Sequence, residues 1–284
     1  MKRFALLAIA ALVTISSFAE NYTLSTPNNT LIIEATKGKV PMFRYYGSTA
    51  TLDEATALGK AMNEEAFHAF GNHCELPYAA LVKFADGDNA LNLVVEDVEK
   101  SKSGNLEALC ITLCDTRHPF RLKLYYSAYD DCDVMKFSTE YINDGKKPVS
   151  LQKYMSASLP LLSKSCTLLS LHGENKNECN ELVEPLGFGT KLLSTQEGNR
   201  TALTTHSSFM LSIEGGLNED SGNVIAGTLS WIGNFSIELI NSALPQRPTM
   251  ILAGINPDAS DYTLAGKASL KTPEFILTYS NKGK

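Results

Sequence analysis

Residues 222–235 read Gly222-Asn-Val-Ile-Ala-Gly-Thr-Leu-Ser-Trp-Ile-Gly-Asn-Phe235, and two further segments of the same kind follow. These are Ile251-Leu-Ala-Gly-Ile-Asn-Pro257 and Lys271-Thr-Pro-Glu-Phe-Ile-Leu-Thr-Tyr-Ser280. Val, Ile, Leu, Phe and Tyr favour strands, whereas the interspersed Gly, Asn and Pro end strand pairing and turn the chain. This C-terminal stretch therefore predicts a series of short β-strands joined by turns.

The order of these segments resembles the end of the N-terminal β-sandwich domain of glycoside hydrolase family 36, the family of α-galactosidases. That domain carries a G-x-x-x-x-G-x-L-x-x-S-G-N-F stretch, then a G-I-N-P turn and a T-P-E strand, and this chain departs at Ile232, where the family has Ser. Upstream, Lys153-Tyr-Met-Ser-Ala-Ser158 resembles the family's K-Y-x-S-A-S strand. The resemblance implies an all-β fold, a large two-sheet antiparallel β-supersandwich like that of galactose mutarotases, with few short helices and no barrel.

The N-terminus has the pattern of an export signal. Lys2 and Arg3 precede an apolar run that is too short to span a bilayer, and Ser17-Phe-Ala19 supplies small residues for a cleavage site. We expect residues 1–19 to be a signal peptide and residues 20–284 to form one sandwich domain. The mature protein is then expected to be periplasmic or secreted.

Charge and composition limit the partners of such a domain. The chain has 284 residues, of which 44% are hydrophobic and 20% are charged, as in ordinary globular proteins. Loss of Lys2 and Arg3 with the signal takes the net charge from −6 to −8. An acidic chain without a basic patch has no electrostatic footprint for nucleic acid or for anionic lipid. We therefore expect neither a nucleic-acid partner nor, after signal removal, a membrane partner.

Six cysteines bear on redox state and metal binding. Cys110 and Cys114 lie on a predicted strand, where their α-carbons are about 13 Å apart at ~3.3 Å per residue, which is beyond disulfide reach. The chain has no C-x-x-C, and its five histidines lack zinc spacing, so no metal or other cofactor is expected. We expect most cysteines to be buried free thiols and leave one disulfide open.

Residue patterns predict the body of the fold. Strands are expected over residues 30–35, 40–46, 106–113, 120–128, 134–143 and 149–162. A short surface helix is expected over residues 51–62, where apolar residues recur at helical spacing. Residues 79–99 predict a hairpin, because two apolar runs flank Asp86-Gly87 and glycine tolerates a positive φ.

The segment with the best candidates for substrate contact is Leu169-Ser-Leu-His172-Gly173-Glu174-Asn175. It resembles the family's F-H-G-D-W segment, which leaves the sandwich and approaches the active site. The resemblance implies that His172, Glu174 and Asn175 contact the substrate, although Asn175 stands where the family has a sugar-stacking Trp. The alternative is a structural His and acid at a strand end.

The single tryptophan, Trp231, lies within an apolar segment that predicts a strand. An exposed indole would suit a sugar platform, since the C–H face of a pyranose stacks on it. Large aromatic side chains are on average highly buried, so we expect Trp231 to be packed between two sheets.

The resemblance covers nearly all of residues 20–284 and leaves out the catalytic machinery. Family members are retaining glycosidases whose two catalytic carboxylates belong to a (β/α)₈ barrel that follows the sandwich. The chain is therefore interpreted as a non-catalytic domain that packs on the barrel of the same or an adjacent polypeptide, shapes the galactoside pocket and contributes to homo-oligomer contacts. Two alternatives stay open: a free-standing carbohydrate-binding module, and an aldose-epimerase-like enzyme that uses His172 and Glu174 for proton transfer.

Overall fold

A computed structural model describes residues 20–51, 53–54, 64–71, 77–163, 165–200, 203–258 and 262–284. Strand makes up 60% of the structure and helix 1%, so the all-β prediction is confirmed. The expected signal peptide at residues 1–19 lies outside the described residues. Most of the expected helix at residues 51–62 also lies outside them, and its two described helical residues are Asp53 and Glu54.

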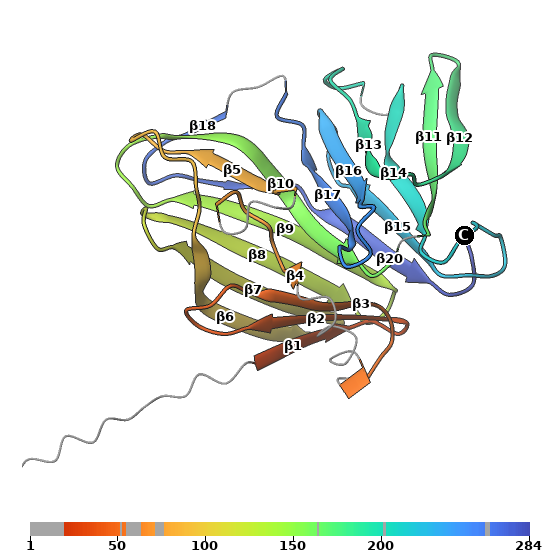
Figure 1. The fold of residues 1–284 in the computed structure, drawn as a ribbon, viewed down its shortest axis with the longest axis horizontal. Coiled ribbons are helices and arrows are strands. Elements are labelled where there is room, and N and C mark those ends of the chain that lie inside the picture. Colours follow the sequence, from red (N-terminus) through yellow and green to blue (C-terminus); the bar gives the residue numbers. More distant parts are fainter. Residues whose placement is uncertain are drawn as a thin grey trace, which may run out of the picture.

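The largest sheet has ten strands, and its neighbouring strands are antiparallel. In spatial order these are β12 (Asn177–Pro185), β11 (Thr167–Glu174), β14 (Thr205–Ser212), β15 (Val224–Leu229), β20 (Phe275–Ser280), β9 (Val134–Asn143), β8 (Phe120–Tyr129), β7 (Leu106–Asp115) and β6 (Leu93–Ser103), with β19 (Ser269–Lys271) also paired to β9. Strands β6 to β9 form a meander on the left of Figure 1, and β11 and β12 stand at the right. The expected strands over residues 106–143 are all present.

A second sheet of six strands is built around β10. Its members are β13 (Gly189–Ser194), β16 (Phe235–Asn241), β17 (Thr249–Ile255), β10 (Val149–Leu161), β18 (Tyr262–Leu264) and β5 (Ala80–Lys83). The first part of β10 pairs with β5 and β18, and the second part pairs with β17. A bulge between Met155 and Ala157 separates the two halves, which allows one long strand to bend over the larger sheet.

A third sheet closes the structure at its N-terminal side. It contains β1 (Glu20–Ser25), β2 (Asn29–Ala35), β3 (Met42–Ser48) and β4 (Glu64–Glu65). Tyr46 on β3 meets Phe137 on β9 edge to face, with ring centroids 6.3 Å apart. The small sheet therefore shares the core of the sandwich.

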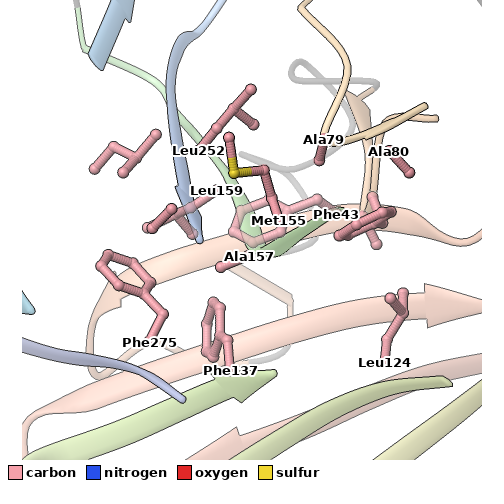
Figure 2. Packing of buried hydrophobic residues seen from close by; sticks show 14 of the residues in the cluster. Phe43, Ala79, Ala80, Leu124, Phe137, Met155, Ala157, Leu159, Leu252 and Phe275 are labelled. Atoms are coloured by element: carbon pink, nitrogen blue, oxygen red, sulfur yellow. The ribbon is translucent and has the colours of Figure 1, made fainter. Parts of the chain in front are cut away.

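The core lies between the ten-stranded sheet and the other two sheets. Along β8 every second residue from Phe120 to Ala128 is buried, which is the alternation expected of a strand with one wet face. Figure 2 shows Leu124 and Phe137 on the large sheet pointing toward Met155 and Ala157 of β10. The predicted antiparallel supersandwich is confirmed, with the four-stranded sheet as an addition to its two large sheets.

The hairpin predicted over residues 79–99 is wrong. The Asp86-Gly87 turn is present, with Gly87 at φ 93° and its N–H donating to the Phe84 carbonyl at 3.0 Å. However, β5 pairs with β10 in the six-stranded sheet, whereas β6 pairs with β7 in the ten-stranded sheet. The turn therefore carries the chain from one sheet to the other instead of joining two paired strands.

Five of the six cysteines are described, and all five are free thiols. Cys166 is buried, Cys110 and Cys114 are half-buried, and Cys132 and Cys179 are exposed. The expectation of mostly buried thiols is wrong because Cys110 and Cys114 alternate with core residues and stand on the outer face of β7. Cys74 lies outside the described residues.

Candidate functional site

His172, the first of the predicted site residues, stands near the end of β11 and is half-buried. Its ring Nε2 lies 2.8 Å from the hydroxyl of Ser170, which is completely buried. Its Nδ1 lies 3.5 Å from the hydroxyl of Thr205 on β14. Both ring nitrogens thus have partners within the sheet, and these contacts set the orientation of the imidazole.

Glu174 and Asn175 stand at the exposed tip of the hairpin that β11 forms with β12. Gly173 is required just before the tip, because a Cβ there would lie 2.5 Å from the Asn177 carbonyl oxygen. Within the described residues, the His172 ring bonds to its sheet neighbours and not to Glu174 or Asn175. The three predicted residues share one hairpin end without converging on one point. The epimerase interpretation, which needs a His and a carboxylate at one substrate atom, gains no support from this geometry.

Loops from both large sheets meet around this hairpin tip. We call this region the loop end and define it as residues 173–175, 195–200, 203–204 and 230–234. The Gly173 N–H donates to the Thr204 carbonyl at 3.2 Å, and the Thr204 hydroxyl donates to Glu197 at 3.1 Å. The Gly198 N–H donates to the Asn234 side-chain oxygen at 2.7 Å. Hydrogen bonds therefore connect the hairpin tip to the connection between β15 and β16.

Trp231 belongs to the loop end and is 40% exposed, so the expectation that it packs between two sheets is wrong. Strand β15 ends at Leu229, and the Trp231 N–H donates to the Leu229 carbonyl at 2.8 Å, which turns the chain out of the sheet. The indole lies against Gly233, where a Cβ would stand 2.6 Å from the indole Nε1. The residue between them, Ile232, is 83% exposed.

Exposed apolar side chains lie on two edge strands of the sandwich and on the connection between them. They are Leu182 and Val183 on β12, Phe188 in the connection to β13, and Leu192 on β13. Strand β12 is the edge of the ten-stranded sheet and β13 is the edge of the six-stranded sheet. We call these four residues the β12–β13 edge. Unpaired backbone groups next to apolar side chains favour coverage by another protein surface.

The outer face of the ten-stranded sheet is apolar beside this edge. Val183, Leu169 and Met210 are consecutive neighbours across β12, β11 and β14. Leu169 and Met210 also line a hollow of about 220 Å³ that reaches Ile276 on β20. The hollow thus extends the apolar surface of the β12–β13 edge over the sheet.

A buried histidine that the sequence did not single out lies in the core. The His68 Nδ1 is 3.1 Å from the Ser158 hydroxyl, and its Nε2 is 3.2 Å from a Glu64 carboxylate oxygen. A Ser–His–Glu series suggests nucleophilic catalysis, but the cavity beside Ser158 measures only about 10 Å³. That volume holds one water molecule at most, so the series is a hydrogen-bonded part of the core.

Among the described residues, no group of three or more His, Cys, Asp or Glu side chains is placed to hold a metal ion. In the same part of the chain, no helix has the length and apolar character needed to cross a membrane.

The fold and the loop end define an antiparallel β-supersandwich domain. The Glycosyl hydrolase family 36 N-terminal domain matches residues 39–265, and the chain belongs to this family. Alpha-galactosidase 1 of Pediococcus pentosaceus is 28% identical over 220 residues, and alpha-galactosidase Mel36A of Lactobacillus acidophilus is 27% identical over 220 residues. Each match takes in 72% of this chain, which spans only 30% of the length of these relatives.

Solved structures of the same family share the fold. The alpha-galactosidase from Lactobacillus brevis superposes with a TM-score of 0.83 at 21% identity, over 93% of this chain and 40% of that one. The alpha-galactosidase AgaA from Geobacillus stearothermophilus also gives 0.83, at 19% identity, over 93% of this chain and 41% of that one. The expected resemblance to the N-terminal sandwich of the family is confirmed.

Proposed function

We propose that this chain serves as the N-terminal domain of an α-galactosidase-type glycosidase and docks on a catalytic domain through the β12–β13 edge. One observation carries the proposal: Phe188, in the connection between β12 and β13, is 74% exposed, and Val183 and Leu192 on those two edge strands are each 50% exposed. Large apolar side chains beside two strand edges favour a covering partner. A catalytic barrel of the same or an adjacent polypeptide is the proposed partner, because the matched relatives are named alpha-galactosidases and exceed this chain in length.

At the loop end, the domain is proposed to form one wall of the galactoside pocket. Glu174 and Asn175 are exposed there, and their oxygen and nitrogen atoms suit hydrogen bonds with sugar hydroxyls. His172 is proposed to hold the hairpin end in position through Ser170 and Thr205, and to face the sugar with its remaining surface. Homo-oligomer contacts are proposed to use the same apolar surface when no catalytic domain covers it.

A binding experiment tests the docking proposal. The mature chain is mixed with a separately produced family 36 catalytic barrel, and complex formation is followed by sedimentation velocity. Val183→Ser and Phe188→Ser are expected to weaken the complex at least about tenfold each, as for central apolar interface residues. Tyr262→Ser is the matched control, because Tyr262 is 37% exposed on β18 at the opposite edge of the six-stranded sheet.

The outcomes separate docking from self-association. A complex that survives both edge substitutions would contradict the docking surface, and the absence of any complex with the native chain would contradict the proposal itself. Self-association that disappears with the same substitutions assigns the edge to a second copy of this chain instead.

Export is also proposed, from the charge and apolar pattern of residues 1–19. Produced in a bacterial host, the chain is expected in the exported fraction with Glu20 as its first residue. Edman sequencing of the recovered protein reads that residue directly. Recovery of the protein in the cytoplasm with Met1 retained would contradict export.

A further inference from the structure

The exposed indole of Trp231 at the loop end is held in position by its neighbours. Trp231 is 40% exposed, yet its ring lies against Gly233, where any Cβ would stand 2.6 Å from Nε1 and 2.9 Å from Cε2. A residue with a side chain at position 233 would therefore displace the ring. The absence of a side chain at Gly233 lets the indole rest on the chain while much of its surface stays in solvent.

Hydrogen bonds on both sides hold the loop that carries the indole. The Ser230 N–H donates to the Glu274 carbonyl and the Trp231 N–H to the Leu229 carbonyl, each at 2.8 Å. At the other end, the Asn234 carbonyl accepts from the Asn256 N–H at 3.1 Å. A ring that is already positioned loses little conformational freedom when a ligand stacks on it.

Exposed polar side chains lie on two loops that hydrogen-bond to the indole loop at Asn234. Gln196 and Asp258 form an exposed hydrogen bond of 3.3 Å, and Glu197 accepts one from the Thr204 hydroxyl at 3.1 Å. The Gly198–Asn234 hydrogen bond connects the loop of Gln196 and Glu197 to the indole loop. A flat aromatic surface on a loop joined to loops with exposed donors and acceptors suits a pyranose, which offers one C–H face and a rim of hydroxyls.

We propose that Trp231 is a stacking platform for a galactosyl residue at the loop end. The choice of galactose rests on the proposed function and on sugar geometry, because the axial O4 leaves the C3, C4 and C5 hydrogens together on one face. The surface differs from the β12–β13 edge, to which four exposed apolar side chains belong. Trp231 thus supplies the aromatic contact that Asn175 cannot make.

The single tryptophan makes the test specific, because all indole fluorescence of the chain comes from Trp231. The native mature chain is titrated with methyl α-galactoside, with methyl α-glucoside as the control sugar. We expect a saturable fluorescence change with a dissociation constant in the millimolar range, about −4 kcal/mol, and a weaker response to the glucoside. Saturation-transfer NMR is expected to label the galactoside H3, H4 and H5 most strongly.

Variants are compared by NMR, which does not need the tryptophan. Trp231→Ala is expected to weaken binding at least about tenfold, Trp231→Phe to retain part of it, and Gly233→Ala to weaken it while keeping the indole. Leu244→Ser is the matched control, because Leu244 is an exposed apolar residue outside the loop end, and it should bind as the native chain does. Circular dichroism confirms that each variant is folded.

Three outcomes would overturn the proposal. They are no saturable response of the native chain, equal binding by Trp231→Ala, or loss of binding in the Leu244→Ser control. If Trp231→Ala and Ile232→Ser abolish binding of a catalytic barrel while the galactoside does not bind, the loop is a protein-docking element instead. Loss of barrel docking with retained galactoside binding would leave the platform intact and contradict only the docking proposal.

Discussion

At the scale of single residues, Asp133 joins the small N-terminal sheet to the large one. It lies in the turn between β8 and β9, and its carboxylate accepts from the Asn28 N–H at 2.7 Å and from the Thr26 hydroxyl at 3.0 Å. Its backbone carbonyl accepts from the Asn29 side chain at 3.2 Å. Asp133 alone thus accepts hydrogen bonds from three residues in and next to the turn between β1 and β2. These hydrogen bonds join that turn to the ten-stranded sheet.

Asp133→Asn is predicted to lower the free energy of unfolding at neutral pH by about 1 kcal/mol, since charge-assisted hydrogen bonds weaken and the site is partly open to water. Burial alone would raise the pKa of Asp133, but hydrogen bonds from Asn28 and Thr26 outweigh it and hold the pKa below its usual 3.8. A lowered folded pKa contributes stability that is present above the unfolded pKa and is lost as the pH falls through the folded one. Urea unfolding should show the difference between the two proteins at pH 7 and a smaller one at pH 3. A difference that does not change with pH would contradict this role.

Trp231 and His172 show the limits of residue patterns at this scale. The apolar run before Trp231 predicts a strand that continues through it, but β15 ends at Leu229, where hydrogen bonds from Ser230 and Trp231 turn the chain. Gly233 contacts the indole within a turn, and the hydrophobic periodicity of the sequence does not predict such a contact. His172 was found through its motif, whereas its partners Ser170 and Thr205 depend on the pairing of β11 with β14.

At the scale of elements, β15 depends on a close contact at Gly227. The rings of Phe209 on β14 and Phe275 on β20 lie on either side of it, stacked with centroids 6.3 Å apart. A Cβ on Gly227 would lie 2.8 Å from the Phe209 ring and 3.0 Å from the Phe275 ring. Both rings are buried, so neither can move without disturbing the core.

Gly227→Ala is predicted to destabilise the domain by about 1–3 kcal/mol, the usual cost of overpacking a core. Gly216→Ala is the matched control, because a Cβ there meets nothing within 4 Å. The control should change stability by less than about 0.5 kcal/mol, as surface substitutions do. Chemical denaturation of both variants measures the difference. Equal stabilities would show that the two phenylalanine rings move aside freely.

The strands themselves were largely predictable, and their partners were not. Residues 120–128 alternate between apolar and polar side chains, so burial of one face decides the strand, and β8 covers Phe120–Tyr129. The hairpin at residues 79–99 was wrong because Asp86-Gly87 determines only a local turn. Whether the flanking strands pair with each other depends on the rest of the core, and here β5 pairs with β10 while β6 pairs with β7.

At the scale of the whole molecule, family membership and fold could be predicted, because the motifs near residues 153–158 and 222–280 resemble those of the family whose N-terminal domain matches residues 39–265. The candidate site could be located only in part. His172, Glu174 and Asn175 do lie at one end of the sandwich, but they do not converge within this domain. We expect a facing surface from the proposed catalytic domain to complete the pocket, and no pattern within this chain describes that surface.

The last prediction follows from how the proposed chemistry is divided between domains. A retaining glycosidase needs two carboxyl groups about 5–5.5 Å apart, and the lowering of the barrier by ~8–23 kcal/mol depends on that geometry. The family resemblance assigns both groups to the barrel, whereas Glu174 and Glu197 of the loop end are exposed acids. The mature chain, purified from a host without α-galactosidase, is therefore expected to release no 4-nitrophenol from its α-galactoside above the buffer rate. Release that co-purifies with the folded chain and disappears in Glu174→Gln would contradict this division, because it would place the reacting carboxylate on the sandwich itself.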